Sequence, residues 1–301
     1  MGRLRSAFPR LDKPMGDAWF MGESRRLFVE LQGDLQSIDI VELDTPLEEI
    51  VVGTISFGPS DEWQQWYHYL LAHLTARSHD GQRHALLEWL ISGFVSQHPD
   101  RISPEPYPGF GRDVLDTLGQ CLMDARCWPS GALDTAACFN HAREPSSGTG
   151  DWFHASGKFS SSMFLCIKYL ETSDIRAWLT SVLRIDDPRW RAQLMLWCVG
   201  ANDLLSGRIR HPSAFSPADY PRIDWQGSRC LTGSPGRNAA ACDFIHPAQR
   251  EAVVDTLQSF MTEATFLAWL QSLCQYERVE TELGDLPYRF YSLYGADHRP
   301  R

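Results

Sequence analysis

Two groups of cysteine and histidine residues contain the atom types that bind zinc. The first consists of Cys127, Cys138, His141 and His154, and the second of Cys230, Cys242 and His246. Structural zinc sites usually take two ligands from one tight turn, as in C-x-x-C, and neither group has such a short spacing. The segment 154–162, "HASGKFSSS", contains Gly-Lys-x-Ser but lacks the glycine and the Ser/Thr that a phosphate-binding loop requires. We therefore expect no bound metal or cofactor and no catalytic residues.

A short pattern occurs three times, each time in a segment with helical periodicity. The copies read "LEWLIS" at 87–92, "RAWLTS" at 176–181 and "LAWLQS" at 267–272. Each copy follows another segment whose apolar residues recur at spacings of three and four, so the sequence predicts three antiparallel helix pairs. Trp89, Trp178 and Trp269 are expected in equivalent buried positions on the second helix of each pair. The alternative is a chance recurrence in a Leu- and Trp-rich helical chain.

The segment 186–208, "DDPRWRAQLMLWCVGANDLLSGR", shows where one of the helices begins and ends. Asp187 can accept hydrogen bonds from free N–H groups at a helix start, and Pro188 suits the first helical position. The following residues are apolar nearly all round, which predicts a helix packed on two sides. Gly200 predicts close approach by a neighbouring helix, and Gly207 supplies the left-handed residue that ends a helix.

The stretch 187–201, "DPRWRAQLMLWCVGA", resembles the second helix of HEAT and armadillo-type repeats, with Trp190 in the aliphatic position. This resemblance implies an α-solenoid that binds a protein partner on its concave face. The spacing of about 90 residues between the tryptophan copies exceeds one repeat of that family, so one unit would hold two repeats.

The stretch 202–210, "NDLLSGRIR", resembles the N-D-x-x-S-x-x-x-E magnesium motif of class I terpene synthases. That resemblance implies that Asn202 and Ser206 hold Mg²⁺ for a diphosphate substrate. Arg210 stands where the family has Glu, and a cation cannot ligate Mg²⁺. The helical enzyme therefore remains the alternative to an interaction module.

The predicted fold is all-α, a solenoid-like array of helix pairs with two long Pro/Gly/Ser-rich loops at 126–160 and 207–247. Residues 61–301 are predicted to form the helical repeat domain. Residues 1–60 form an ambiguous N-terminal segment, where 24–57 reads as helix or as a short hairpin turning at Gly33–Asp34, and "IVVGTISF" at 50–57 is a candidate strand.

The second loop combines arginine and aromatic residues, the types that anchor protein interfaces. We predict partner binding by Arg208, Arg210, Phe215, Tyr220, Arg222 and Trp225. The alternative is that the aromatic side chains of this loop fold back and cover the core.

Composition and charge restrict the function further. A net charge of −10 disfavours nucleic acid as a partner, because phosphate backbones require a dense Lys/Arg surface. Eight scattered cysteines favour free thiols in a reducing cytoplasm, and no apolar run is long enough for a transmembrane helix. The start of the chain fits the acylation pattern M-G-x-x-x-S at Gly2, which is short enough to occur by chance, and we do not expect acylation. The sequence thus predicts a cytoplasmic protein-interaction module without catalytic chemistry.

Overall fold

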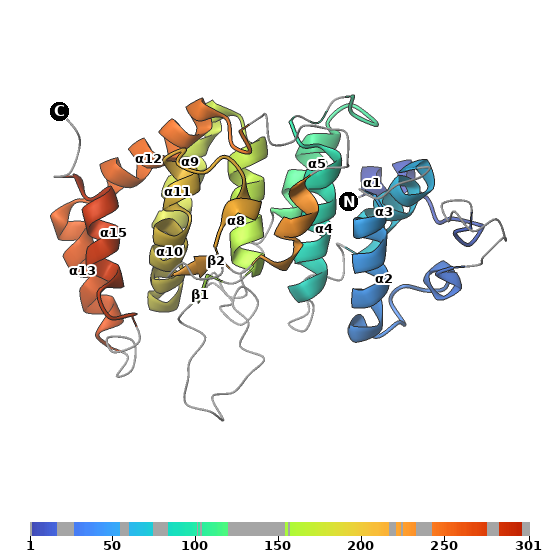
Figure 1. The fold of residues 1–301 in the computed structure, drawn as a ribbon, viewed down its shortest axis with the longest axis horizontal. Coiled ribbons are helices and arrows are strands. Elements are labelled where there is room, and N and C mark those ends of the chain that lie inside the picture. The colour runs from blue at the N-terminus through green and yellow to red at the C-terminus, as the bar shows by residue number, and fades with distance from the viewer. Residues whose placement is uncertain are drawn as a thin grey trace. The chain divides into compact units, whose positions relative to one another are not determined.

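The computed structural model describes residues 2–16, 27–54, 60–74, 84–100, 102, 104–119, 154–155, 157–216, 221–223, 225–232, 243–275 and 283–296. Helices dominate these residues (Figure 1), so the predicted all-α class is confirmed. The sheet in the described part is a parallel pair of two-residue strands, β1 (His154–Ala155) and β2 (Arg222–Ile223). No helix among the described residues is both long enough and apolar enough to cross a membrane. The chain divides into two compact units.

Unit 1 comprises Met1–Gln120 and Gln226–Cys242. Its α2 lies against both α3 and α4, and the 3-10 helix η7 lies along α4. Two glycines allow close packing, since a Cβ at Gly53 would lie 2.3 Å from the Trp63 ring and one at Gly93 2.4 Å from the Tyr67 ring. The elements are α1 (Gly2–Ala7), η1 (Val29–Gln32), α2 (Ile40–Gly53), α3 (Ser60–Leu74), α4 (His84–Gln97), α5 (Phe110–Leu118) and η7 (Gln226–Thr232).

The N-terminal segment, which the sequence left as helix or hairpin, is helical over α2. Asp39 caps this helix, with its carboxylate accepting the N–H of Val41 at 2.8 Å. The strand predicted at 50–57 is wrong for residues 50–53, which form the last turn of α2, while residues 55–57 lie outside the described residues. Ile50 and Val51 are fully buried on the helix, and a short apolar run of this kind fits either structure until packing decides. Residues 27–54 contain no hairpin. The predicted boundary at residue 60 falls inside unit 1.

Unit 2 comprises Cys121–Trp225 and Asp243–Arg301. Its central element is α10, which contacts α13, α15 and both short strands. A second set of contacts joins α12 to α9 and α8. The helices are α8 (Gly157–Tyr169), α9 (Thr172–Leu183), α10 (Pro188–Gly200), α11 (Asn202–Leu205), η6 (Pro212–Ala214), α12 (Pro247–Phe260), α13 (Glu263–Leu273) and α15 (Leu286–Tyr294).

The helix predicted from 188 begins as expected and is divided near its end. Asp187 caps α10, since its carboxylate accepts the N–H of Trp190 at 2.9 Å, and Pro188 occupies the first position. The helix is buried nearly all round, as predicted. The prediction of a neighbouring helix at Gly200 is wrong, because β2 and the residue before it approach there: a Cβ would lie 2.7 Å from the Pro221 carbonyl oxygen and 3.0 Å from Ile223 Cδ1. The chain turns at Ala201 and continues as α11, and Gly207 follows with a φ of 77°.

The three recurring tryptophans lie on α4, α9 and α13, and each is buried as expected. The serine three residues later donates its hydroxyl to a backbone carbonyl in every copy: Ser92 to Glu88 at 2.7 Å, Ser181 to Trp178 at 2.6 Å and Ser272 to Trp269 at 2.7 Å. Each hydrogen bond satisfies the serine hydroxyl, whose burial ranges from full at Ser92 to half-buried at Ser272 and exposed at Ser181. Equivalence of the three positions stays a prediction.

Candidate binding site

The six residues predicted to bind a partner have different surroundings. Arg208, Arg210 and Arg222 are exposed, Phe215 is half-buried and Trp225 is buried, whereas Tyr220 lies outside the described residues. The predicted loop also contains η6, β2 and η7, which are short elements without a helical periodicity of their own. The cysteine and histidine groups considered for zinc lie largely outside the described residues. Of these groups, Cys230 is buried and His246 is exposed.

The aromatic side chains of the loop complete an aromatic core in unit 2. Trp225 stacks on Phe164 of α8, with ring centroids 5.6 Å apart and an angle of 16° between the planes. Phe215 stacks on the same ring at 6.2 Å, and Phe244 meets Trp225 edge-on at 6.3 Å. Such stacked and edge-to-face pairs stabilise a core beyond the area that they bury. The positions of Phe215 and Trp225 therefore match the alternative in which the aromatic side chains of the loop fold back and cover the core.

Two arginines of the loop, Arg208 and Arg210, are positioned by carboxylates close to them. Arg208 donates to Asp203 through Nε at 2.8 Å and through Nη2. Asp243 pairs with two arginines, Arg210 at 3.3 Å and Arg250 at 2.9 Å. Backbone hydrogen bonds from Ile209 to Asp203 and from Phe244 to Arg210 hold the loop itself. The guanidinium groups are thus ordered at the surface by local pairs.

Gly207 allows the turn that brings these arginines together. Its positive φ is the left-handed conformation that glycine adopts without strain. The Arg250 guanidinium packs against it, because a Cβ at this position would lie 3.2 Å from the Arg250 Cζ. A side chain at residue 207 would therefore be strained and would also displace Arg250.

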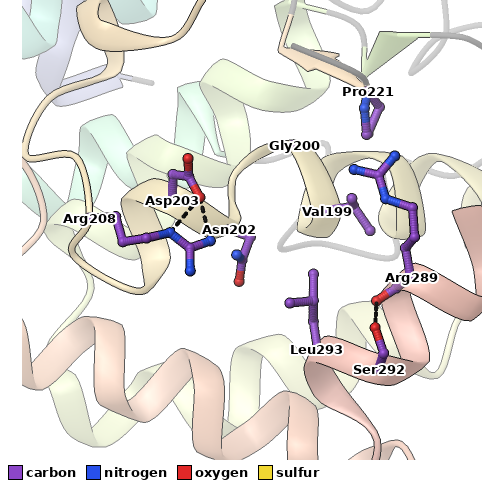
Figure 2. A pocket seen from close by; sticks show the side chains of 9 residues that line it. All are labelled: Val199, Gly200, Asn202, Asp203, Arg208, Pro221, Arg289, Ser292 and Leu293. Atoms are coloured by element: carbon purple, nitrogen blue, oxygen red, sulfur yellow. Dashed lines mark hydrogen bonds and ion pairs between the residues drawn. The ribbon is translucent and has the colours of Figure 1, made fainter.

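A cavity of about 340 Å³ opens beside Arg208. Residues of α10, α11 and α15 form most of its wall, and Figure 2 shows their side chains. Volumes of this order suit a small ligand or a single inserted side chain. The lining residues are Val199, Gly200, Asn202, Asp203, Arg208, Pro221, Arg289, Ser292 and Leu293.

A buried tyrosine holds the helices of this cavity together. The hydroxyl of Tyr294 on α15 lies 3.0 Å from the Cys198 carbonyl oxygen and 3.1 Å from the Asn202 side-chain oxygen. Burial raises the pKa of Tyr294 well above its ordinary value, so the phenol stays protonated and can donate. Burial also raises the pKa of the Cys198 thiol, which makes this cysteine a poor nucleophile. These groups connect α10, α11 and α15 and do no acid–base chemistry at neutral pH.

The residues implied by the terpene synthase resemblance are already engaged within the protein. The Asn202 side-chain oxygen accepts from Tyr294, and the Ser206 hydroxyl donates to the Asp203 carbonyl at 3.3 Å. The Asp203 carboxylate forms an ion pair with Arg208, and Arg210 forms one with Asp243. No cluster of three His, Cys, Asp or Glu residues suited to a metal occurs in the described part of the chain. The arrangement is better suited to an anion than to a cation.

Four arginines lie in this region: Arg208, Arg210, Arg250 and Arg289. Arg208 pairs with Asp203, and both Arg210 and Arg250 pair with Asp243. Sequence reasoning found Arg208 and Arg210 because they share one loop. It missed Arg250 and Arg289, which lie on separate helices and carry no motif. Their arrangement depends on the packing of α12 and α15.

The chain matches no protein-family model, no curated protein and no solved structure. The HEAT/armadillo and terpene synthase resemblances therefore stay predictions.

Proposed function

We propose that this protein is a protein-interaction module, built as a solenoid-like array of helix pairs, that binds an acidic segment of a partner. The binding surface, called here the arginine surface, consists of Arg208, Arg210 and Arg222. The observation that carries the proposal is the exposure of three arginines of one loop on a chain whose net charge is −10. Arginine binds carboxylates through two parallel N–H bonds, which gives geometric specificity as well as affinity.

Electrostatics favours an acidic peptide over other partners. An acidic segment is repelled by most of this protein and attracted at the arginine surface, which orients the encounter and suppresses non-specific binding. Nucleic acid would need a longer basic surface to neutralise several phosphates at once. A cytoplasmic location is part of the proposal, because Cys166, Cys198 and Cys230 are buried free thiols and Cys274 is an exposed one.

The proposal is tested by capturing partners from the native host with wild-type protein and with the triple variant Arg208→Gln, Arg210→Gln, Arg222→Gln. A matched control, Arg112→Gln, Arg176→Gln, Arg184→Gln, removes the same charge from exposed arginines on α5, on α9 and at the end of α9. Mass spectrometry should identify partners that the wild type and the control capture and the site variant loses. The melting temperatures should stay close to that of the wild type, since the pairs involved are at the surface.

Equal loss of the same partners by both variants would mean that net charge alone drives capture, and retention by the site variant would place the binding surface elsewhere. Heating with and without Mg²⁺ and diphosphate tests the enzyme alternative, because a ligand of the native state raises the melting temperature. We expect no such rise.

A further inference from the structure

Residues 2–16 form an arm that lies on unit 1 with its apolar side chains inward. Leu4 and Met15 are buried, and Phe8 and Leu11 are half-buried. Their spacings of four, three and four residues are those of one side of an amphipathic helix, although the chain is helical only as far as Ala7 in α1. The exposed side of this segment, called here the basic arm, carries four cations and one carboxylate: Arg3, Arg5, Arg10, Lys13 and Asp12.

Three cations of the basic arm are available to a partner. Arg5, Arg10 and Lys13 form no ion pair with any residue that the structure describes. Burial lowers the pKa of His73, and the charge of Arg5 acts in the same direction. Burial raises the pKa of Tyr69, and the charge of Arg10 opposes that rise. Because the two rings are neighbours on α3, with centroids 4.9 Å apart, Arg5 and Arg10 lie over the same part of this helix.

The basic arm is attached to unit 1 through two imidazoles and one ion pair. The Phe8 ring stacks on His68 of α3, with centroids 4.6 Å apart and 11° between the planes. The Phe8 carbonyl oxygen lies 3.2 Å from Nε2 of His73 and can accept its hydrogen. Arg3 pairs with Asp113 of α5 at 2.6 Å. Two of these three attachments therefore involve a group that gains a proton in acid.

Acid acts on these attachments in one direction. Burial lowers the pKa of His68, His73 and His98, and the nearby His98 adds to the effect on His68. The attached arm thus disfavours charged imidazoles, and their protonation shifts the equilibrium towards a released arm. Asp113, the carboxylate among the described groups of this interface, is already paired with Arg3. Around His68, the charged and titratable groups are His73 of α3, His98 of α4, Tyr107 and Asp113 at α5, and Arg3 and Arg5 of the arm.

We propose that the basic arm is an acid-released anchor for an anionic lipid surface. Protonation of His68, His73 and His98 detaches the arm from unit 1, and its cations and apolar side chains then bind the membrane. Cations are attracted to anionic headgroups, and the apolar side of a short amphipathic segment enters the boundary with the acyl chains. This anchor is independent of the arginine surface, which belongs to unit 2.

A lipid surface suits the basic arm better than other anions do. Release exposes the apolar side chains of the arm to water, and the acyl boundary of a bilayer buries them again. Nucleic acid or an acidic peptide would engage the cations alone. The net charge of −10 means that most of the chain is repelled by an anionic membrane, so contact is confined to the arm.

The test measures co-sedimentation of the full chain with phosphatidylcholine vesicles that contain about one third phosphatidylserine, at pH 7 and pH 5. At least about fivefold more protein should bind at pH 5, and vesicles of phosphatidylcholine alone should bind little at either pH. The triple variant Arg5→Gln, Arg10→Gln, Lys13→Gln should bind at least about tenfold more weakly at pH 5. The triple control variant of α5 and α9, which removes the same charge, should bind as the wild type does. Equal binding at both pH values, or equal binding by the arm and control variants, would overturn the proposal.

Two further variants separate release of the arm from lipid binding. Asp113→Asn removes the ion pair with Arg3 and leaves the arm itself unchanged, so more protein should bind anionic vesicles at pH 7 than in the wild type. His68→Phe keeps a ring under Phe8 and removes one titrating group, so half-maximal binding should need a lower pH. Wild-type pH dependence in both variants would overturn acid release. Acid-dependent binding of single-stranded DNA without vesicle binding would assign the arm to nucleic acid and overturn the lipid anchor.

Discussion

The two units each contain an aromatic cluster covered by a segment distant in sequence, and the clusters differ in one kind of ring. In unit 1, Phe8 stacks on His68 at 4.6 Å and its carbonyl lies 3.2 Å from Nε2 of His73. His68 and His98 both meet Phe110 edge-on, at 6.1 and 5.9 Å. In unit 2, Trp225 covers Phe164 beside Phe244 and Trp197. We call these the histidine cluster (Phe8, His68, His98, Phe110) and the tryptophan cluster (Phe164, Trp197, Trp225, Phe244).

The difference teaches that similar burial can give opposite responses to acid. Burial lowers the pKa of His68 to about 4, with a further contribution from His98 nearby, and burial also lowers the pKa of His98 to about 4. The four rings of the tryptophan cluster do not gain a proton in this range, and the histidine next to them, His211, meets only the edge of the cluster at Phe244, with ring centroids 5.4 Å apart. The cover of unit 1 should therefore be released by acid, and the cover of unit 2 should not.

The largest expected effect is the loss of a buried tryptophan ring, which can be tested in each unit. Changing Trp89, Trp178 or Trp269 to Ala should lower the free energy of unfolding by about 3–5 kcal/mol each, because each ring is buried. Urea denaturation measures the loss, and Val41→Ala, at a side chain 80% exposed, serves as the control. A loss below about 1 kcal/mol at any of the three positions would remove it from the proposed repeat.

Acidification should weaken unit 1 more than unit 2. Unfolded histidine has a pKa near 6.5, so between pH 6.5 and 4 the unfolded state binds more protons than the folded state, and stability falls as the pH falls. The contribution of His68 alone amounts to roughly 2–3 kcal/mol. Burial raises the pKa of Asp44 in the same unit, and this acts in the opposite sense near pH 4. Hydrogen exchange at residues 2–8 of unit 1, compared with residues 222, 223 and 225 of unit 2, measures the difference.

A phenylalanine at position 68 provides the control for this acid response. The His68 Nε2 atom is buried without a hydrogen-bond partner, so His68→Phe keeps the stacked ring and loses only the hydrogen bond between the imidazole and the Gln64 backbone. This variant should lose the part of the acid response that His68 contributes, while His73 and His98, whose pKa values burial also lowers, keep their parts. Acid release that persists unchanged in His68→Phe would show that other groups govern it.

How much the sequence predicts depends on how local the determining interactions are. The cap at Asp187 and the left-handed Gly207 follow from neighbouring residues, and both were predicted. The burial of Trp225 depends on Phe164 of α8, and no local sequence pattern reveals this contact. The sequence therefore could not decide whether Trp225 covers the core or anchors a partner. The cavity joins Asn202 to Arg289 through helix packing, and only Arg208 among its charged residues had been assigned a binding role.

A smaller effect is expected when the cover of unit 2 is reduced without being removed. Trp225→Phe keeps an aromatic ring over Phe164 and leaves a small void, which should cost about 1–2 kcal/mol. The loss should be the same at pH 7 and pH 5, since the ring on which Trp225 stacks, Phe164, does not titrate. A pH-dependent loss, measured by urea denaturation at both values, would break the contrast between the clusters.

The smallest effect on stability is expected next to that cover, at the arginine surface. Arg210 is 65% exposed at its side chain, and Asp243 keeps its pair with Arg250 at 2.9 Å when Arg210 is removed. Arg210→Gln should therefore change the free energy of unfolding by less than about 0.5 kcal/mol, as exposed ion pairs usually do. The same change should weaken partner capture, because it removes a bidentate donor from the proposed interface.

Trp225→Phe should give the opposite result, which is lower stability with partner capture retained. If Arg210→Gln instead lowered the melting temperature by several degrees with capture intact, Arg210 would belong to the structural cover with Trp225, and the arginine surface would lose a member.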